Sequence, residues 1–104
     1  MNRPIISSLA SVGAGAMASA LLTAWVREGL VRAEDVVAID ILASRRQALQ
    51  KELGVRSTDC IAEGVAGAQV VLLAIKPQHV TIEVLSEMRA GLGPDTLVIS
   101  IAAG

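Results

Sequence analysis

The residues IISSLASVGAGAMA, 5–18, carry the strongest structural signal in this chain of 104 residues. The first part, 5–12, predicts a β-strand, although three serines dilute its β-branched content. The loop GAGAMA, residues 13–18 and here called the glycine loop, follows directly. Gly13 allows a sharp turn, Gly15 leaves room for the backbone to approach a pyrophosphate, and Ala18 lets the next helix pack closely on the strand. This stretch therefore predicts a strand, turn and helix of the type that binds a dinucleotide.

Predicted strands and helices alternate along the rest of the chain. Apolar residues recur at helical spacing over 16–28, and this helix is expected to end at Gly29. The runs at 35–41, 69–75 and 96–101 are largely apolar, which is typical of strands buried in a parallel sheet. The remaining predicted elements are a helix over 45–53 capped by Ser44, a strand over 55–57, a helix over 60–66 capped by Asp59, and a helix over 78–89 with Val80, Val84, Leu85 and Met88 inward.

This order predicts an α/β fold, namely a Rossmann-like doubly wound parallel sheet of about five strands in the order 3-2-1-4-5. A chain of this length forms one domain, so residues 1–104 are expected to be a single NAD(P)-binding domain. Hydrophobic residues make up 53% of the chain and charged residues 18%, which excludes a disordered chain or a coiled coil. The apolar excess predicts surface that another domain covers, and self-association where it is left bare.

Charge and cysteine content exclude several other classes. Nine basic and ten acidic side chains give a net charge of −1, so we expect neither a nucleic-acid nor a membrane partner. No run reaches the roughly 20 apolar residues of a membrane span. The single cysteine, Cys60, rules out an intrachain disulfide framework and predicts a cytoplasmic protein. His79 is the only histidine and has no partner at metal-ligand spacing, so neither a metal site nor a histidine base is expected.

The choice between NAD and NADP depends on residues after the second predicted strand. Asp40 follows Gly15 by 25 positions, near the spacing at which an acid receives the adenosine ribose hydroxyls of NAD. A carboxylate there repels the 2′-phosphate of NADP, whereas Ser44, Arg45 and Arg46 offer donors for that phosphate. The plainer alternative is a loop acid beside solvated arginines. The sequence leaves both cofactors open.

Two further segments end strands at the same expected edge of the sheet. Lys76-Pro77 follows the predicted central strand, where a lysine can hydrogen-bond a ribose or simply face solvent. The chain closes on SIAAG, residues 100–104, whose small side chains let a flat nicotinamide ring lie close or merely pack tightly.

Three motifs together resemble one enzyme family: VGAGAMASAL at 12–21, AIKPQ at 74–78 and ISIAAG at 99–104, with ELGV at 52–55 in support. Over essentially its whole length the chain is similar to the N-terminal domain of Δ1-pyrroline-5-carboxylate reductases. The resemblance implies reduction of pyrroline-5-carboxylate to proline by hydride from NADPH or NADH, with NADPH favoured. Such enzymes continue into a helical domain that forms the dimer and supplies the substrate pocket. We therefore expect a homo-oligomer when that domain is present, and an incomplete catalyst without it.

The spacing and the resemblance together predict the cofactor contacts and no catalytic side chain. The expected cofactor-binding residues are Gly13, Ala14, Gly15, Ala16, Met17, Asp40, Ser44, Arg45, Ala74, Ile75, Lys76, Pro77, Ala102 and Ala103. The family usually has an aromatic or large apolar residue in place of Ser11, and often asparagine or another polar residue in place of Ala16. Two alternatives stay open: a stand-alone or degenerate NAD(P)-binding module, and the cofactor domain of another β-hydroxyacid-dehydrogenase-like reductase.

Overall fold

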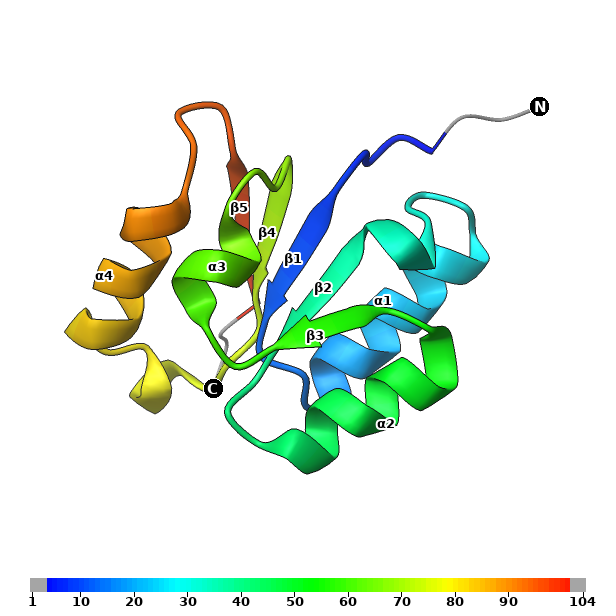
Figure 1. Cartoon of the computed structure of the whole chain (residues 1–104), viewed down its shortest axis with the longest axis horizontal. Helices are drawn as coiled ribbons and strands as arrows, with labels where there is room; N and C mark the ends of the chain where they lie inside the picture. Colours follow the sequence, from blue (N-terminus) through cyan, green and yellow to red (C-terminus); the bar gives the residue numbers. More distant parts are fainter. Residues whose placement is uncertain (1–3, 102–104) are drawn as a thin grey trace.

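A computed structural model describes residues 4–101 and shows a parallel sheet flanked by helices (Figure 1). The five strands are β1 (Leu9–Val12), β2 (Val36–Ile39), β3 (Arg56–Thr58), β4 (Val70–Leu73) and β5 (Leu97–Ser100). They lie in the order β3-β2-β1-β4-β5, and every neighbouring pair is parallel. The predicted fold class and strand order are confirmed.

Helices cover both faces of this sheet, as the parallel pairing requires. The helices are α1 (Ala16–Arg27), α2 (Ala43–Leu53), α3 (Ile61–Val65) and α4 (Ile82–Gly91), with 3-10 turns at Ala33–Asp35 and Pro77–His79. Leu22 of α1 and Leu49 of α2 belong to one buried cluster, whereas Val65 of α3 and Met88 of α4 belong to the other. The sheet therefore lies between an α1/α2 layer and an α3/α4 layer.

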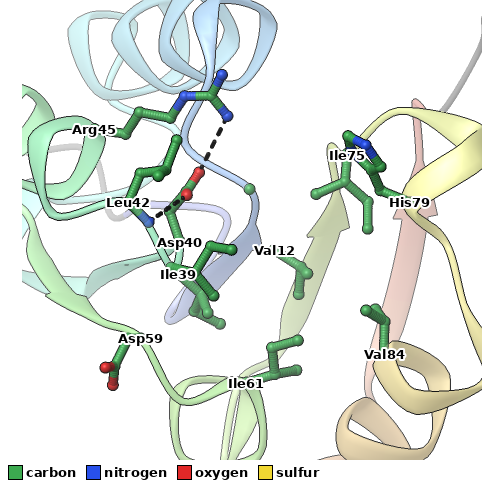
Figure 2. Close-up of a pocket in the computed structure, with 12 residues that line it drawn as sticks. Val12, Ile39, Asp40, Leu42, Arg45, Asp59, Ile61, Ile75, His79 and Val84 are labelled. Carbon is green, nitrogen blue, oxygen red and sulfur yellow. Dashed lines mark hydrogen bonds and ion pairs between the residues drawn. The ribbon is translucent and has the colours of Figure 1, made fainter.

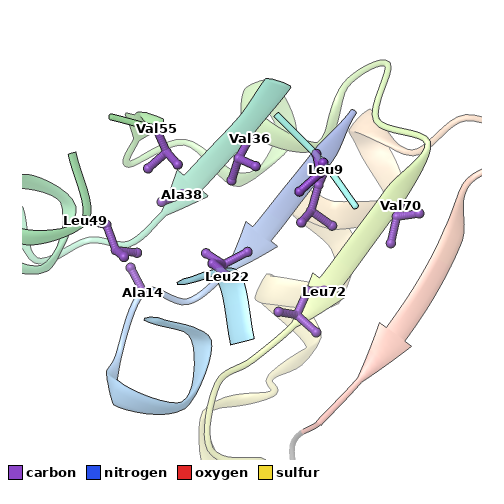
Figure 3. Packing of buried hydrophobic residues seen from close by; sticks show 10 residues of the cluster. Leu9, Ala14, Leu22, Val36, Ala38, Leu49, Val55, Val70 and Leu72 are labelled. Atoms are coloured by element: carbon purple, nitrogen blue, oxygen red, sulfur yellow. The ribbon is translucent and has the colours of Figure 1, made fainter. Parts of the chain in front are cut away.

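Strand β1 lies at the centre of the sheet and is buried along its whole length. Leu9 packs in the cluster beneath α1 and α2, together with Val36 of β2 and Leu72 of β4 (Figure 3). Ala10 and Val12 belong to the cluster beneath α3 and α4, as the two-residue alternation of a strand requires. The loop that leaves β1 is thus anchored in the most buried part of the molecule.

The single helix predicted over 78–89 is wrong at its start. Pro77–His79 form a 3-10 turn, and α4 begins only at Ile82. Thr81 is the N-cap, because its side-chain oxygen accepts a hydrogen bond from the Val84 amide at 3.2 Å. Leu85 is exposed instead of inward, while Met88 is buried as predicted.

The predicted helix caps at Ser44 and Asp59 are also wrong. Helix α2 follows Leu42, so that Ser44 lies inside its first turn, and α3 follows Cys60. In each case a side chain two residues before the N-cap holds the turn. The Leu42 amide donates to Asp40 at 2.9 Å, and the Cys60 amide donates to Thr58 at 3.2 Å.

Strand β5 forms an edge of the sheet and is the least buried strand. Leu97 and Val98 are exposed there, as are Ile82 and Leu85 of the neighbouring helix α4. Within residues 4–101, no helix is long and apolar enough to cross a membrane.

Candidate dinucleotide-binding site

A cavity of about 420 Å³ opens at the edge of the sheet where the parallel strands end (Figure 2). Its lining comes from the turn after β1, the loop after β2, the start of α3, the segment after β4 and the start of α4. Gly13, Asp40 and Arg45 supply its polar side, and Ile61, Ile75 and Val84 supply much of its apolar side. Ligands of open α/β sheets bind at this edge, so the cavity is the candidate site.

Gly13 makes the sharp turn that the sequence predicts. Its φ is +110°, a value that residues other than glycine rarely adopt, and a Cβ there would lie 2.6 Å from the carbonyl oxygen of Ala74. The Gly13 amide also donates to the carbonyl of Ile39 at 2.7 Å. Conformation and space both require glycine at this position.

Gly15 has a different role, since its backbone conformation is open to any residue. The atoms nearest to a Cβ built on Gly15 belong to the Arg45 guanidinium, at 3.7 and 3.8 Å. Gly15 is also the N-cap of α1, offers no side-chain cap, and precedes a first turn without acidic residues. The amides at the start of this 12-residue helix are thus arranged to receive an anion.

Asp40 is nearly buried, with 8% of its side chain exposed. One carboxylate oxygen accepts a hydrogen bond from the Ala14 amide at 3.0 Å, and the other accepts from the Leu42 amide at 2.9 Å. The Arg45 guanidinium lies 3.6 Å from the first of these oxygens (Figure 2). Asp40 therefore ties the glycine loop to the loop after β2. Contact of Asp40 with a ribose stays a prediction.

The two neighbouring arginines differ in their availability. Arg46 donates to the carbonyl oxygen of Asp40 at 2.7 Å and so holds the backbone of the loop. Arg45 is 52% exposed and lines both the main cavity and a smaller one of about 260 Å³ between α1 and α2. Ser44 lines that smaller cavity too. Arg45 is the better placed of the two to meet a phosphate.

The predicted residues after β4 divide into two groups. The Ala74 amide donates to the Val12 carbonyl at 2.9 Å, and Ile75 lines the cavity. Lys76 and Pro77 are exposed and stand outside the lining. Ala102 and Ala103, also predicted as cofactor contacts, lie outside the described residues.

Two residues that line the site, Ile41 and Leu42, escaped the sequence analysis. Ile41, Leu42 and Ile61 form apolar walls of the cavity, and Ile41 is 84% exposed. A large apolar side chain two or three residues after a strand end is the signal that points to such a wall. His79 lines the cavity as well. Among residues 4–101, no three histidine, cysteine or acidic side chains gather as metal ligands would.

The five-stranded parallel sheet, the glycine turn after β1 and the cavity at the strand ends define a Rossmann-like dinucleotide-binding domain. The chain belongs to the family described as "NADP oxidoreductase coenzyme F420-dependent", which matches residues 8–104.

Relatives of the chain carry the name suggested by its motifs. The pyrroline-5-carboxylate reductase of Methanosarcina acetivorans is 38% identical over 93 residues, which are 89% of this chain and 34% of that protein. A solved pyrroline-5-carboxylate reductase from Coxiella burnetii superposes with a TM-score of 0.82 at 25% identity, covering 91% of this chain and 35% of that one. A Plasmodium falciparum pyrroline carboxylate reductase with NADP bound has a TM-score of 0.74 at 21% identity, over 96% and 34% of the two chains. The chain thus spans about a third of the length of the curated relatives it matches.

Proposed function

We propose that this chain is the NAD(P)-binding domain of a pyrroline-5-carboxylate reductase, an enzyme that reduces pyrroline-5-carboxylate to proline. The observation that carries the proposal is the glycine loop, which is anchored in the buried strand β1 and opens at the cavity beside Asp40 and Arg45. The similarity to reductases of that name, over nearly the whole of this chain, supports the choice of reaction.

The residues present fit a dinucleotide. The uncapped start of α1 suits a pyrophosphate, and no backbone or apolar atom crowds the place where a Gly15 side chain would stand. Ile41, Leu42 and Ile61 give an apolar surface that suits an adenine ring. Residues 13–17 would hold the pyrophosphate, Ser44 and Arg45 the adenosine end, and residues 74–77 with Ala102 and Ala103 the nicotinamide half.

NADPH is the preferred cofactor in this proposal. The exposed guanidinium of Arg45 can accept a phosphate group, while the Asp40 carboxylate is already occupied by two backbone amides. The family description names NADP, and the Plasmodium falciparum neighbour has NADP bound.

Bound NADPH supplies the hydride, and this chain supplies binding and orientation. The glycine loop fixes the pyrophosphate, and the apolar walls exclude water from one end of the cofactor. A helical domain outside this chain is proposed to form the substrate pocket and to join the subunits of a homo-oligomer. A cytoplasmic location, and the lack of nucleic-acid and membrane partners, belong to the same proposal.

A chimera tests the reaction. Residues 1–104 would replace the matching third of the Methanosarcina acetivorans reductase, and NADPH oxidation would be followed with pyrroline-5-carboxylate. We expect oxidation that depends on the substrate and forms proline, and none from the 104-residue chain alone. A chimera that binds NADPH and assembles like its parent but forms no proline would contradict the assigned reaction.

A further inference from the structure

One peptide bond of the glycine loop is held at both of its ends by side chains. The Ser11 hydroxyl donates a hydrogen bond to the Gly13 carbonyl at 2.7 Å. The Ala14 amide donates to a carboxylate oxygen of Asp40 at 3.0 Å. The Gly13 carbonyl and the Ala14 amide belong to the same peptide group. Ser11 comes from β1 and Asp40 directly follows β2, so two neighbouring strands place the side chains that fix this peptide.

Both contacts lie in poorly hydrated surroundings. Ser11 is fully buried, and among residues 4–101 it is the only polar residue that is buried as a whole. Ala14 is buried, and the Asp40 side chain is 8% exposed. Hydrogen bonds in such places are costly to break, because water does not readily replace the lost partner. A hydroxyl at the centre of this sheet therefore has a specific use, and the glycine loop is what it contacts.

The peptide needs such control because Gly13 does not supply it. A glycine with φ of +110° tolerates several orientations of the peptide that follows, since no Cβ restricts the rotation. A rotated peptide would turn the Ala14 amide away from Asp40 and move Gly15, the N-cap of α1. The position of the first amides of α1 thus depends on the two side-chain contacts.

We infer that Ser11 and Asp40 are positioning residues that lock the Gly13–Ala14 peptide and so hold the glycine loop ready for the pyrophosphate of NAD(P)H. This inference rests on the proposed function and adds a role for two residues in it. Asp40 then acts mainly on the loop and not as the acceptor that selects between riboses. Arg45, 3.6 Å from the carboxylate, is its ion-pair partner.

The test uses Ser11→Ala and Asp40→Asn, each close to the natural residue in shape, and the double variant. Ser11→Thr keeps the hydroxyl, and Ser86→Ala on the exposed side of α4 is a control for the loss of a serine. Calorimetric titration at low temperature compares NADPH, NADH and adenosine 2′-monophosphate, which lacks a pyrophosphate. Thermal unfolding of each variant confirms that it is folded during the titration.

Each single variant is expected to bind NADPH and NADH more weakly by the same factor, about three- to tenfold. A loss of this size corresponds to one hydrogen bond. Adenosine 2′-monophosphate should bind these variants as tightly as it binds the unsubstituted chain. Ser11→Thr should bind NADPH more tightly than Ser11→Ala, and Ser86→Ala should leave all affinities unchanged. The affinity of the double variant for NADPH should fall by a smaller factor than the two single-variant factors multiplied together, because either change alone frees the peptide.

Two kinds of result would overturn the inference. If Asp40→Asn weakened NADH while leaving or improving NADPH, Asp40 would be a ribose acceptor. If both single variants bound both cofactors like the unsubstituted chain, the lock would have no role in binding. Failure of the unsubstituted chain to bind either cofactor would instead defeat the proposed function, and this inference with it.

Discussion

The Cα of Gly13 faces the carbonyl oxygen of Ala74 so closely that a Cβ at Gly13 would lie 2.6 Å from that oxygen. The contact joins the glycine loop after β1 to the segment after β4, 61 positions further along the chain by their residue numbers. The Ala74 amide also donates to the Val12 carbonyl at 2.9 Å, so a hydrogen bond joins the two segments at the residue before Gly13. The shape of the loop is therefore set by the sheet as well as by its own sequence.

Gly13→Ala is expected to destabilise the fold by about 1–3 kcal/mol, through the strain of a positive φ and the clash with Ala74. It should also lower the affinity for NADPH by more than about tenfold, because the loop must shift. Gly29→Ala is the matched control: φ is +76°, but no atom lies within 4 Å of its Cβ position. For Gly29→Ala, chemical denaturation should show a smaller loss of stability, and calorimetry should show an unchanged affinity for NADPH. Equal NADPH affinity of the two variants would refute the account of Gly13.

The packing of α3 on α4 depends on a second glycine. A Cβ at Gly91 would collide with the carbonyl oxygen of Ala62 and with Val65, both in α3. Gly91→Ala should lower the free energy of unfolding by about 1–3 kcal/mol. At Gly93, two residues on, the nearest atom to a Cβ is 3.6 Å away, so Gly93→Ala should cost little. Urea denaturation of both variants measures the difference, and similar stabilities would contradict the packing described here.

Arg45→Gln should lower the affinity for NADPH about tenfold and the affinity for NADH less than twofold. Only NADPH carries the 2′-phosphate that the guanidinium is expected to meet. Lys51→Gln removes the same charge from an exposed position of α2 and should affect neither cofactor. Calorimetric titrations of both variants with both cofactors measure the selectivity. An equal loss for NADPH and NADH in Arg45→Gln would place the guanidinium on the pyrophosphate instead.

The exposed residues of β5 and α4 predict self-association of the chain when it is alone. Leu97 is 59% exposed on an edge strand, next to exposed Val98, and such edges pair with other chains. Sedimentation velocity should show an average mass that rises with concentration, and Leu97→Glu should reduce the rise. Gln47→Glu adds the same charge on α2 and should leave the rise in mass unchanged. A monomer at every concentration for the unsubstituted chain would count against this interpretation.

The sequence predicted the fold because its strongest signals are local. Apolar runs gave the strands, the glycine loop gave the turn after β1, and the alternation of elements gave the strand order, which the structure confirms. The start of α4 was missed because Thr81, one of several polar residues in that region, is the one whose side chain meets a free amide. That choice depends on how Pro77–His79 turn, which a helical periodicity does not reveal.

The site was predicted less completely for a related reason. Glycine spacing located the loop, and the position of Asp40 after a strand marked the edge of the cavity. The contact of Ser11 with Gly13 was invisible, since a serine in a strand reads only as a weak strand former. The direction of the Asp40 carboxylate, toward Ala14, depends on two strands meeting in space.

Titration of the unsubstituted chain with NADPH and with NADH addresses the central proposal. We predict saturable binding of one NADPH per chain with a dissociation constant below about 1 mM, and weaker binding of NADH. Absence of saturable binding by both cofactors at millimolar concentration would contradict the assignment of this chain as an NAD(P)-binding domain.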